Sequence, residues 1–257
     1  MSVMRGYHDG SYGDGFADVY DDWYAGITDT DTSVAALAGL AGRGRVLELG
    51  VGTGRLAIPL AATGSEVHGV DSSEAMLHRL AAKPGGHAVH AVRGDMVDDL
   101  PVGPFSLVLV AYNTFFSLLT EERQQACFHA VAARLGEGGV FALEAFVPDT
   151  QSTAASSLTV RSVQVDRVVL SVSTADVDGQ RAEGQYVEIT EGGGVRLRPW
   201  SIRWATVSQL DTMAAAAGLV LRDRWESFAG EPFDHDSARH VSVYTPRSGV
   251  KSGHVRS

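Results

Sequence analysis

Strands and helices alternate along the first 150 residues in the pattern of hydrophobic and polar positions. Short apolar runs predict five strands, at residues 45–49, 66–70, 87–92, 105–110 and 139–146. Runs with apolar residues three or four positions apart predict helices between them, at residues 54–63, 72–82 and 121–135. Strands that alternate with helices at this spacing form right-handed βαβ units, so we expect an α/β fold with a mainly parallel sheet.

The two flanks of this region follow other patterns. Apolar residues at helical spacing predict an N-terminal helical cap over residues 1–42, of which we expect 1–15 to be mobile. Residues 158–204 alternate as antiparallel strands do, with hairpin signals at Asp178-Gly179 and Gly192-Gly193-Gly194. A helix at 207–217 and strands near 219–228 and 240–245 then complete the core.

These elements predict one domain over residues 1–257. Its parts are the cap, an α/β core at 43–148 and 205–246, a β insertion at 149–204, and a disordered tail at 247–257.

Charge and composition narrow the classes of partner. The formal net charge is −10 and no Lys/Arg-rich run is present, so we expect no nucleic-acid partner. No apolar stretch is long enough to span a membrane and no signal peptide is recognisable, so we expect a cytoplasmic protein.

The single cysteine, Cys127, is interpreted as a core residue. Seven Asp and one Arg within the first 31 residues indicate either a solvated segment or an acidic approach for a cationic substrate.

The clearest local signal is the glycine loop Gly50-Val51-Gly52-Thr53-Gly54, between a strand and a helix. Such a loop brings the backbone close to a ligand at a helix N-terminus, but alone it does not distinguish between nucleotide cofactors. Arg55 stands where the dinucleotide fingerprint has its last glycine. Glu48, just before the loop, would repel a pyrophosphate and suits a cofactor that carries an ammonium and a sulfonium.

Two further carboxylates end the next strands. Asp71 is placed to accept hydrogen bonds from both ribose hydroxyls, and Asp95 from an adenine amino group, with Met96 against the ring. Because the carboxyl ends of parallel strands meet at one edge of a sheet, these residues are expected to form one ligand site.

Together these motifs resemble the class I S-adenosylmethionine-dependent methyltransferases. The residues that carry the resemblance are Glu48 to Gly54, Asp71, Gly94-Asp95-Met96 and Ala111-Tyr112-Asn113, and it covers residues 16–148 and 207–246. It implies a Rossmann-like seven-stranded mixed sheet of order 3-2-1-4-5-7-6, with strand 7 antiparallel and helices on both faces. It implies S-adenosylmethionine as cofactor and S-adenosylhomocysteine as product. The cofactor-binding residues expected from it are Tyr20, Tyr24, Glu48, Gly50, Gly52, Gly54, Arg55, Asp71, Ser72, Asp95, Met96 and Ala111.

The N-terminal aromatic residues and the insertion bear on the acceptor. Tyr20 and Tyr24 resemble the aromatic segment that covers the cofactor in small-molecule N-methyltransferases, or they only pack the helix. The insertion resembles those that family members use as a substrate platform or a dimer surface, so a homodimer stays open. Its arginines 196, 198 and 203 are interpreted as a solvated face, with carboxylate binding as the alternative.

A second, shorter resemblance concerns the loops near the acceptor. Residues 113–116 and 229–233 are similar to methyltransferases that modify the N-terminus of small ribosomal peptides. Phe115 and Phe116 are expected to line an acceptor pocket.

Methyl transfer from a sulfonium is an in-line displacement in which the protein mainly positions the reactants. The candidate catalytic residues are Asn113, Glu144, Glu231 and His240. We expect no metal site, because no cluster of ligands with metal-binding spacing is present.

The sequence therefore predicts a methyltransferase acting on an amine, or else a hydroxyl, of a small metabolite or peptide in specialised metabolism. The alternatives are an NAD-dependent oxidoreductase on the same fold and a non-catalytic cofactor-binding or dimerisation protein.

Overall fold

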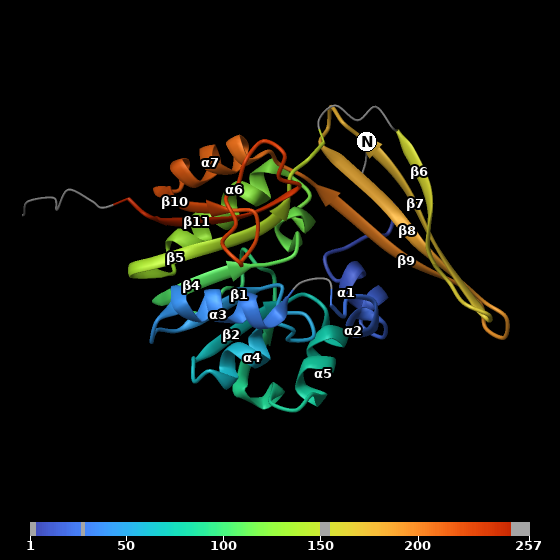
Figure 1. Ribbon diagram of the computed structural model, residues 1–257, viewed down its shortest axis with the longest axis horizontal. Coiled ribbons are helices and arrows are strands. Elements are labelled where there is room, and N and C mark those ends of the chain that lie inside the picture. Colours follow the sequence, from blue (N-terminus) through green and yellow to red (C-terminus); the bar gives the residue numbers. More distant parts are fainter. Residues whose placement is uncertain (1–3, 27–28, 150–154, 248–257) are drawn as a thin grey trace, which may run out of the picture.

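Seven strands form the mixed sheet of the α/β core in the computed structural model, which describes residues 4–26, 29–149 and 155–247. This sheet lies to the left in Figure 1. The strands are β1 (Val46–Leu49), β2 (Val67–Asp71), β3 (Val89–Arg93), β4 (Phe105–Val110), β5 (Leu135–Phe146), β10 (Leu219–Trp225) and β11 (Arg239–Pro246). Their order is β3-β2-β1-β4-β5-β11-β10, and β11 runs antiparallel to both of its neighbours. This confirms the order and the antiparallel seventh strand that the resemblance implied.

Helices cover both faces of this sheet (Figure 1). One face carries α3 (Thr30–Ala41), α4 (Ala57–Ala62) and α5 (Glu74–Ala82), and the other carries α6 (Glu121–Ala132) and α7 (Val207–Ala216). The central strand β4 is buried on both faces, as its unbroken apolar run predicts. Short 3₁₀ turns lie at Gly86–Ala88 and Thr114–Ser117. No helix in the described residues is both long and apolar enough to cross a membrane.

The boundaries of the helices follow local chemistry. Ser73, Thr120 and Thr206 each accept a hydrogen bond from a backbone N–H of the first turn that they cap. The helix predicted from residue 54 begins instead at Ala57, because the glycine loop extends to Gly54. Pro59 is the third residue of α4, where a backbone N–H has no partner within the helix.

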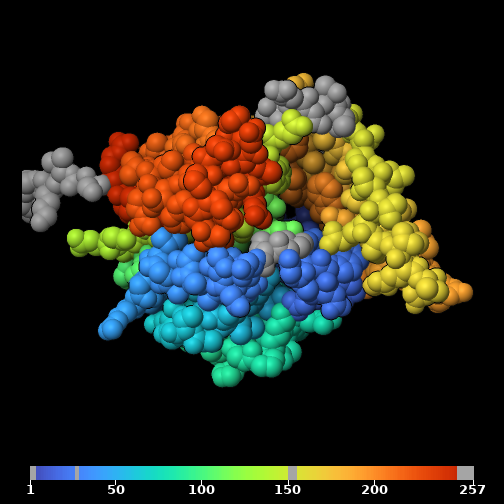
Figure 2. Space-filling view, viewed as in Figure 1, coloured from blue at the N-terminus to red at the C-terminus, as the bar shows by residue number. Residues whose placement is uncertain are grey.

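The N-terminal segment packs against the core. Residues 4–15 were expected to be mobile, but they include α1 (Ser11–Phe16), and α2 (Tyr20–Trp23) follows. Phe16 is fully buried and its ring meets the ring of Tyr186 edge-on at 5.7 Å. Because α3 lies on the sheet of the core, the name cap is used from here on for residues 4–26 alone. This cap fills the angle between the α/β core and the insertion (Figures 1 and 2).

Four antiparallel strands form the insertion: β6 (Ser156–Val163), β7 (Arg167–Asp176), β8 (Arg181–Thr190) and β9 (Gly194–Arg203). Asp178-Gly179 and Gly192-Gly193 lie in the turns between them, as predicted. One face of this sheet meets the cap. The other face is apolar and exposed, and includes Leu158, Val160, Val172, Ile189, Val195 and Leu197.

The interpretation of arginines 196, 198 and 203 as a solvated face is wrong for two of them. The Arg198 side chain is 1% exposed and binds the carboxylates of Asp18 and Glu188 at 2.6 and 2.7 Å. Arg203 is buried and donates to Gln124 Oε1 at 2.6 Å and Glu121 Oε2 at 2.7 Å. Their partners are carboxylates and an amide of the chain itself, and all of them except Glu188 belong to segments that are distant in the sequence. Only Arg196 is half-exposed, in an ion pair with Asp18.

Candidate active site

The glycine loop after β1 is open on the side where a ligand would approach. Gly50 and Gly52 have φ of 69° and 54°, a left-handed conformation that favours glycine. A Cβ at Gly50 would collide with the side chain of Thr114, whereas a Cβ at Gly52 would meet nothing within 4 Å. The loop therefore leaves free space directly beside its backbone.

Glu48 places a carboxylate in a buried position directly before the glycine loop. Its residue is 4% exposed, and Oε2 has no hydrogen-bond partner among the described residues. Burial raises the pKa of Glu48 to about 8, and the nearby guanidinium of Arg55 offsets only part of this effect. A buried carboxylate of this kind is suited to a ligand that brings a positive charge and N–H donors.

Asp71 holds the glycine loop and faces the same space. Its Oδ2 accepts from Gly52 N at 2.8 Å and its Oδ1 from Ser73 N at 2.9 Å, while burial raises the pKa of its carboxyl group. Each carboxylate oxygen keeps a second lone pair, so two ligand hydroxyls can still be accepted. The hydroxyl of Ser72 donates instead to the backbone oxygen of Asp9 in the cap, at 2.9 Å.

Asp95 shapes the turn after β3. Its Oδ1 accepts from Val97 N, Asp98 N and the guanidinium of Arg123. None of these hydrogen bonds uses Oδ2, which leaves one oxygen for an amino group. Met96 is partly buried beside the core.

Tyrosines of the cap lie over this edge of the sheet. The rings of Tyr20 and Tyr24 are 4.7 Å apart, and Tyr12 Oη donates to Tyr24 Oη at 3.1 Å. Burial raises the pKa of Tyr24 to about 12 and raises that of Tyr20 as well. Both hydroxyls therefore stay protonated near neutral pH and can donate hydrogen bonds.

Acidic residues of the cap bind the glycine loop and both ends of α5. Asp21 Oδ1 accepts from Thr53 Oγ1 at 2.6 Å and from Lys83 Nζ at 2.7 Å. Asp14 Oδ1 accepts from Ser73 Oγ at 2.6 Å. This role could not be predicted from the sequence, because acidity near a terminus does not reveal which internal donors the side chains reach.

The end of β4 is fixed by its neighbour β5. Tyr112 and Asn113 have φ of 50° and 67°, which is uncommon outside glycine. Glu144 Oε2 accepts from Tyr112 N at 2.9 Å, and Asn113 Oδ1 accepts from Phe146 N at 2.7 Å. With the backbone held in this way, the ring of Tyr112 lies against that of Tyr24, and the two ring centres are 5.6 Å apart. The guanidinium carbon of Arg55 lies 5.8 Å from the centre of the Tyr112 ring.

Comparison with known proteins shows the family to which the chain belongs. A family profile described as a methyltransferase domain matches residues 46–139. The cypemycin N-terminal methyltransferase of a Streptomyces species is 33% identical over 204 residues, which cover 77% of this chain and 81% of the relative. The chain belongs to the S-adenosylmethionine-dependent methyltransferases.

Solved structures agree with this assignment. The CcbJ methyltransferase from Streptomyces caelestis is 39% identical, with a TM-score of 0.86 over 93% of this chain and 99% of that one. The S-adenosylmethionine-bound CalS10 from Micromonospora echinaspora, named an amino pentose methyltransferase, has the same fold. Its TM-score is 0.63 at 24% identity, over 88% of this chain and 97% of that one.

Two predicted catalytic residues of this methyltransferase lie apart from Glu144. His240 is fully buried, its Nδ1 lies 2.8 Å from Ser242 Oγ, and burial lowers its pKa to about 4. In β11, Val241 is the residue that pairs with Glu144, so His240 points to the opposite face of the sheet. Glu231 is exposed in a loop, and a hydrogen bond from Ser227 lowers its pKa.

The expectation that Phe115 and Phe116 line an acceptor pocket is not supported. Both are fully buried, and their rings pack edge-on against Phe128 and Phe146 in the core. Tyr112 presents its ring toward the cap instead. Cys127 is also a core residue, as interpreted, and burial raises the pKa of its thiol to about 12.

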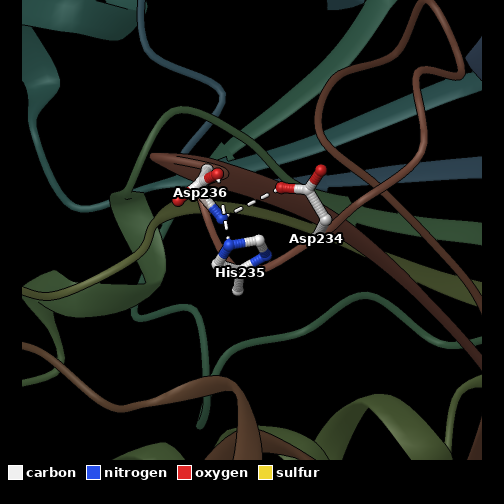
Figure 3. Close-up of side chains that lie close together, drawn as sticks. All are labelled: Asp234, His235 and Asp236. Atoms are coloured by element: carbon white, nitrogen blue, oxygen red, sulfur yellow. Dashed lines mark hydrogen bonds and ion pairs between the residues drawn. The ribbon is translucent and has the colours of Figure 1, made fainter.

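One group of side chains in the described residues has the composition of a metal site. Asp234, His235 and Asp236 are consecutive and exposed in the loop before β11 (Figure 3). Asp236 N donates to Asp234 Oδ1, and His235 Nε2 lies 3.2 Å from Asp236 Oδ2. Such exposed acidic loops are common without an ion, and this one carries no assignment.

Proposed function

We propose that this methyltransferase uses S-adenosylmethionine to methylate an amine of a small metabolite or a peptide. The buried carboxylate of Glu48, whose Oε2 has no hydrogen-bond partner in the part of the chain that the structure describes, is the observation that carries the cofactor assignment. It suits an ammonium group and does not suit a pyrophosphate.

The remaining cofactor contacts follow from the donors and acceptors around the loop. Arg55 would bind the cofactor's carboxylate, Asp71 the ribose hydroxyls, and Asp95 with Met96 the adenine. Gly50, Gly52, Gly54 and Ala111 would form the backbone wall, and Tyr20 and Tyr24 the roof. Ser72 would act through the cap, since its hydroxyl already binds Asp9. When bound, the cofactor supplies an electrophilic methyl group.

An amine acceptor is favoured by the chemistry of the facing residues. The tyrosines of the cap remain protonated, so they orient an acceptor and exclude water but do not remove a proton from it. Burial raises the pKa of Glu144, so its carboxylate binds a proton more readily than an exposed one and suits a group that holds an amine as it loses its proton. Asn113 would fix the backbone beneath the reacting atoms. Glu231 and His240 are weaker candidates, because one is exposed and the other is a poor base.

The names of two relatives also support nitrogen as the accepting atom. One acts on the N-terminus of cypemycin, and the other is an amino pentose methyltransferase. A peptide and an amino sugar are different acceptors, so the shared feature is the amine itself.

Two measurements test the proposal. Calorimetry should show binding of S-adenosylhomocysteine, and replacing Asp71 by Ala should weaken it about 10- to 100-fold because the hydroxyls lose a charged acceptor. A screen of amines, phenols and short peptides, read by mass, should show one or two added methyl groups on amines. Absence of cofactor binding, or methylation of phenols alone, would overturn the proposal.

A further inference from the structure

Arg161 is placed by an irregularity in the insertion sheet. The pairing of β6 with β7 shifts between Val160 and Ser162, so Arg161 is an extra residue in that strand. Such a bulge re-aims the side chain that it carries, and bulges are common beside active sites. Here the guanidinium carbon lies 4.9 Å from the ring centre of Trp23, 5.3 Å from that of Tyr24 and 5.0 Å from that of Tyr186.

Four other arginines of this sheet differ from Arg161 in their partners. Arg167, Arg196, Arg198 and Arg203 each form an ion pair with a carboxylate of the chain. Arg161 has no carboxylate partner in the described part of the chain, and its one hydrogen bond there goes to the backbone oxygen of Trp23 at 3.0 Å. A guanidinium carries five N–H groups, so most of its donors remain for another molecule.

Arg161 lies on the acceptor side of the site. Tyr24 contacts both Arg161 and Tyr112, and Tyr112 in turn lies beside Arg55. The two tyrosine rings thus separate Arg55, next to Glu48 and the glycine loop, from Arg161, which reaches from the insertion toward the cap. An acceptor lying against these rings would have its amine near Tyr112 and another group against Arg161.

We propose that Arg161 binds a carbonyl-type oxygen close to the acceptor's amine, so that the acceptor is an α-amino carbonyl compound. A free amino acid offers a carboxylate there, and the first residue of a peptide offers an amide oxygen. Both are acceptors of the kind that a guanidinium recognises. This inference rests on the proposed N-methylation and narrows its substrate class.

Three probes with the same amine and side chain distinguish these sources: phenylalanine, the dipeptide phenylalanyl-glycine, and phenylalaninol, which lacks the carbonyl group. Binding to the enzyme saturated with S-adenosylhomocysteine is measured by calorimetry. We expect at least one carbonyl-bearing probe to bind about tenfold or more tightly than phenylalaninol. Preference for phenylalanine indicates a carboxylate, and preference for the dipeptide indicates a peptide oxygen.

Variants assign the preference to Arg161. Arg161→Gln should abolish it while S-adenosylhomocysteine still binds, and Arg161→Lys should retain part of it. Arg196→Gln is the matched control on the same sheet and should keep the full preference. Equal binding of all three probes, no binding of any, or a preference that survives in Arg161→Gln would overturn the inference. Failure of the unmodified enzyme to bind S-adenosylhomocysteine would instead remove the proposed function itself.

Discussion

At the residue scale, Glu48 illustrates a conflict between stability and binding. Its folded-state pKa of about 8 lies above the ordinary value of 4.5. The folded protein therefore holds an extra proton between these values, and the free energy of unfolding falls as pH rises through that window. A buried carboxylate that would bind the ammonium group of the cofactor therefore destabilises the protein when no cofactor is bound.

Replacing Glu48 by Gln should remove this pH dependence. Without ligand, the variant should match the unmodified protein near pH 5 and exceed it in stability at pH 8.5 by about 2–4 kcal/mol. Urea unfolding at the two pH values measures the difference. Parallel stability curves for the two proteins would contradict the raised pKa.

The same residue predicts a proton release on cofactor binding. At pH 7 Glu48 is mostly protonated in the free protein, and an ammonium group next to it favours the carboxylate. Binding of S-adenosylhomocysteine should therefore release nearly one proton, and almost none in Glu48→Gln. Calorimetry in phosphate and in Tris, whose ionisation enthalpies differ, counts the protons. Equal release by both proteins would place the cofactor's amine elsewhere.

At the scale of elements, the joint between the cap and β9 depends on Arg198. This side chain is buried, donates to Gly15 O, and pairs with Asp18 and Glu188. Removing one partner of a buried ion pair costs about 3–5 kcal/mol when the charge left behind has no other partner. Because Arg167 and Arg196 still pair with Glu188 and Asp18, Arg198→Met should lower the unfolding free energy by an amount at the lower end of that range, about 3 kcal/mol. Arg196→Gln, which removes a half-exposed pair with the same Asp18, should cost less than about 1 kcal/mol. Similar losses in both variants would contradict this assignment.

The core could be predicted from the sequence because its central strands β1 and β4 are almost wholly buried, and because β1 and β2 end in recognisable ligand residues. Neither feature applied to the insertion. The alternation in residues 194–203 correctly predicted a strand with two distinct faces, but we assigned the arginine face to solvent. The structure has the reverse: Arg198 faces the cap, and Val195 and Leu197 are exposed. Alternation separates two faces, and what lies opposite each face depends on segments far away in the chain.

The candidate site, like the fold, could be predicted from the sequence only in part. Glu48 and Asp71 follow from their places at strand ends, where local sequence fixes the geometry. Arg161 could not be found in this way, because its inward aim comes from a bulge in a register that only the folded sheet defines. From the sequence, His240 was predicted as a candidate catalytic residue, but its burial lowers its pKa to about 4, which makes it a poor base.

At the scale of the whole molecule, charge is distributed to complement the architecture. The aspartates of the cap bind the core through Asp14 and Asp21 and the insertion through Asp18. The N-terminal acidity thus joins three parts of the fold around the candidate site. This explains why the polar face of the insertion is buried and its apolar face is left at the surface.

That apolar face predicts self-association, the alternative use foreseen for the insertion. Leu158 and Leu197 are 68% and 57% exposed, and β6 is an edge strand. Monomeric proteins rarely expose a contiguous apolar surface of this kind. Since it is nearly uncharged, a second copy of the same face is a complementary partner, and two such sheets can pack face to face. Sedimentation velocity at micromolar concentration should show a homodimer.

Substitutions on that face should separate the copies. Leu158→Lys combined with Leu197→Lys should give a monomer that still binds S-adenosylhomocysteine, because these side chains point away from the cap and the cofactor loops. Val102→Lys is the control: Val102 is 83% exposed in the loop before β4, so its replacement adds a charge outside the insertion and should leave the dimer intact. A monomer in the unmodified protein, or a dimer that persists in the double variant, would show that this face serves another purpose. Loss of cofactor binding together with the dimer would instead indicate that the two copies complete each other's site.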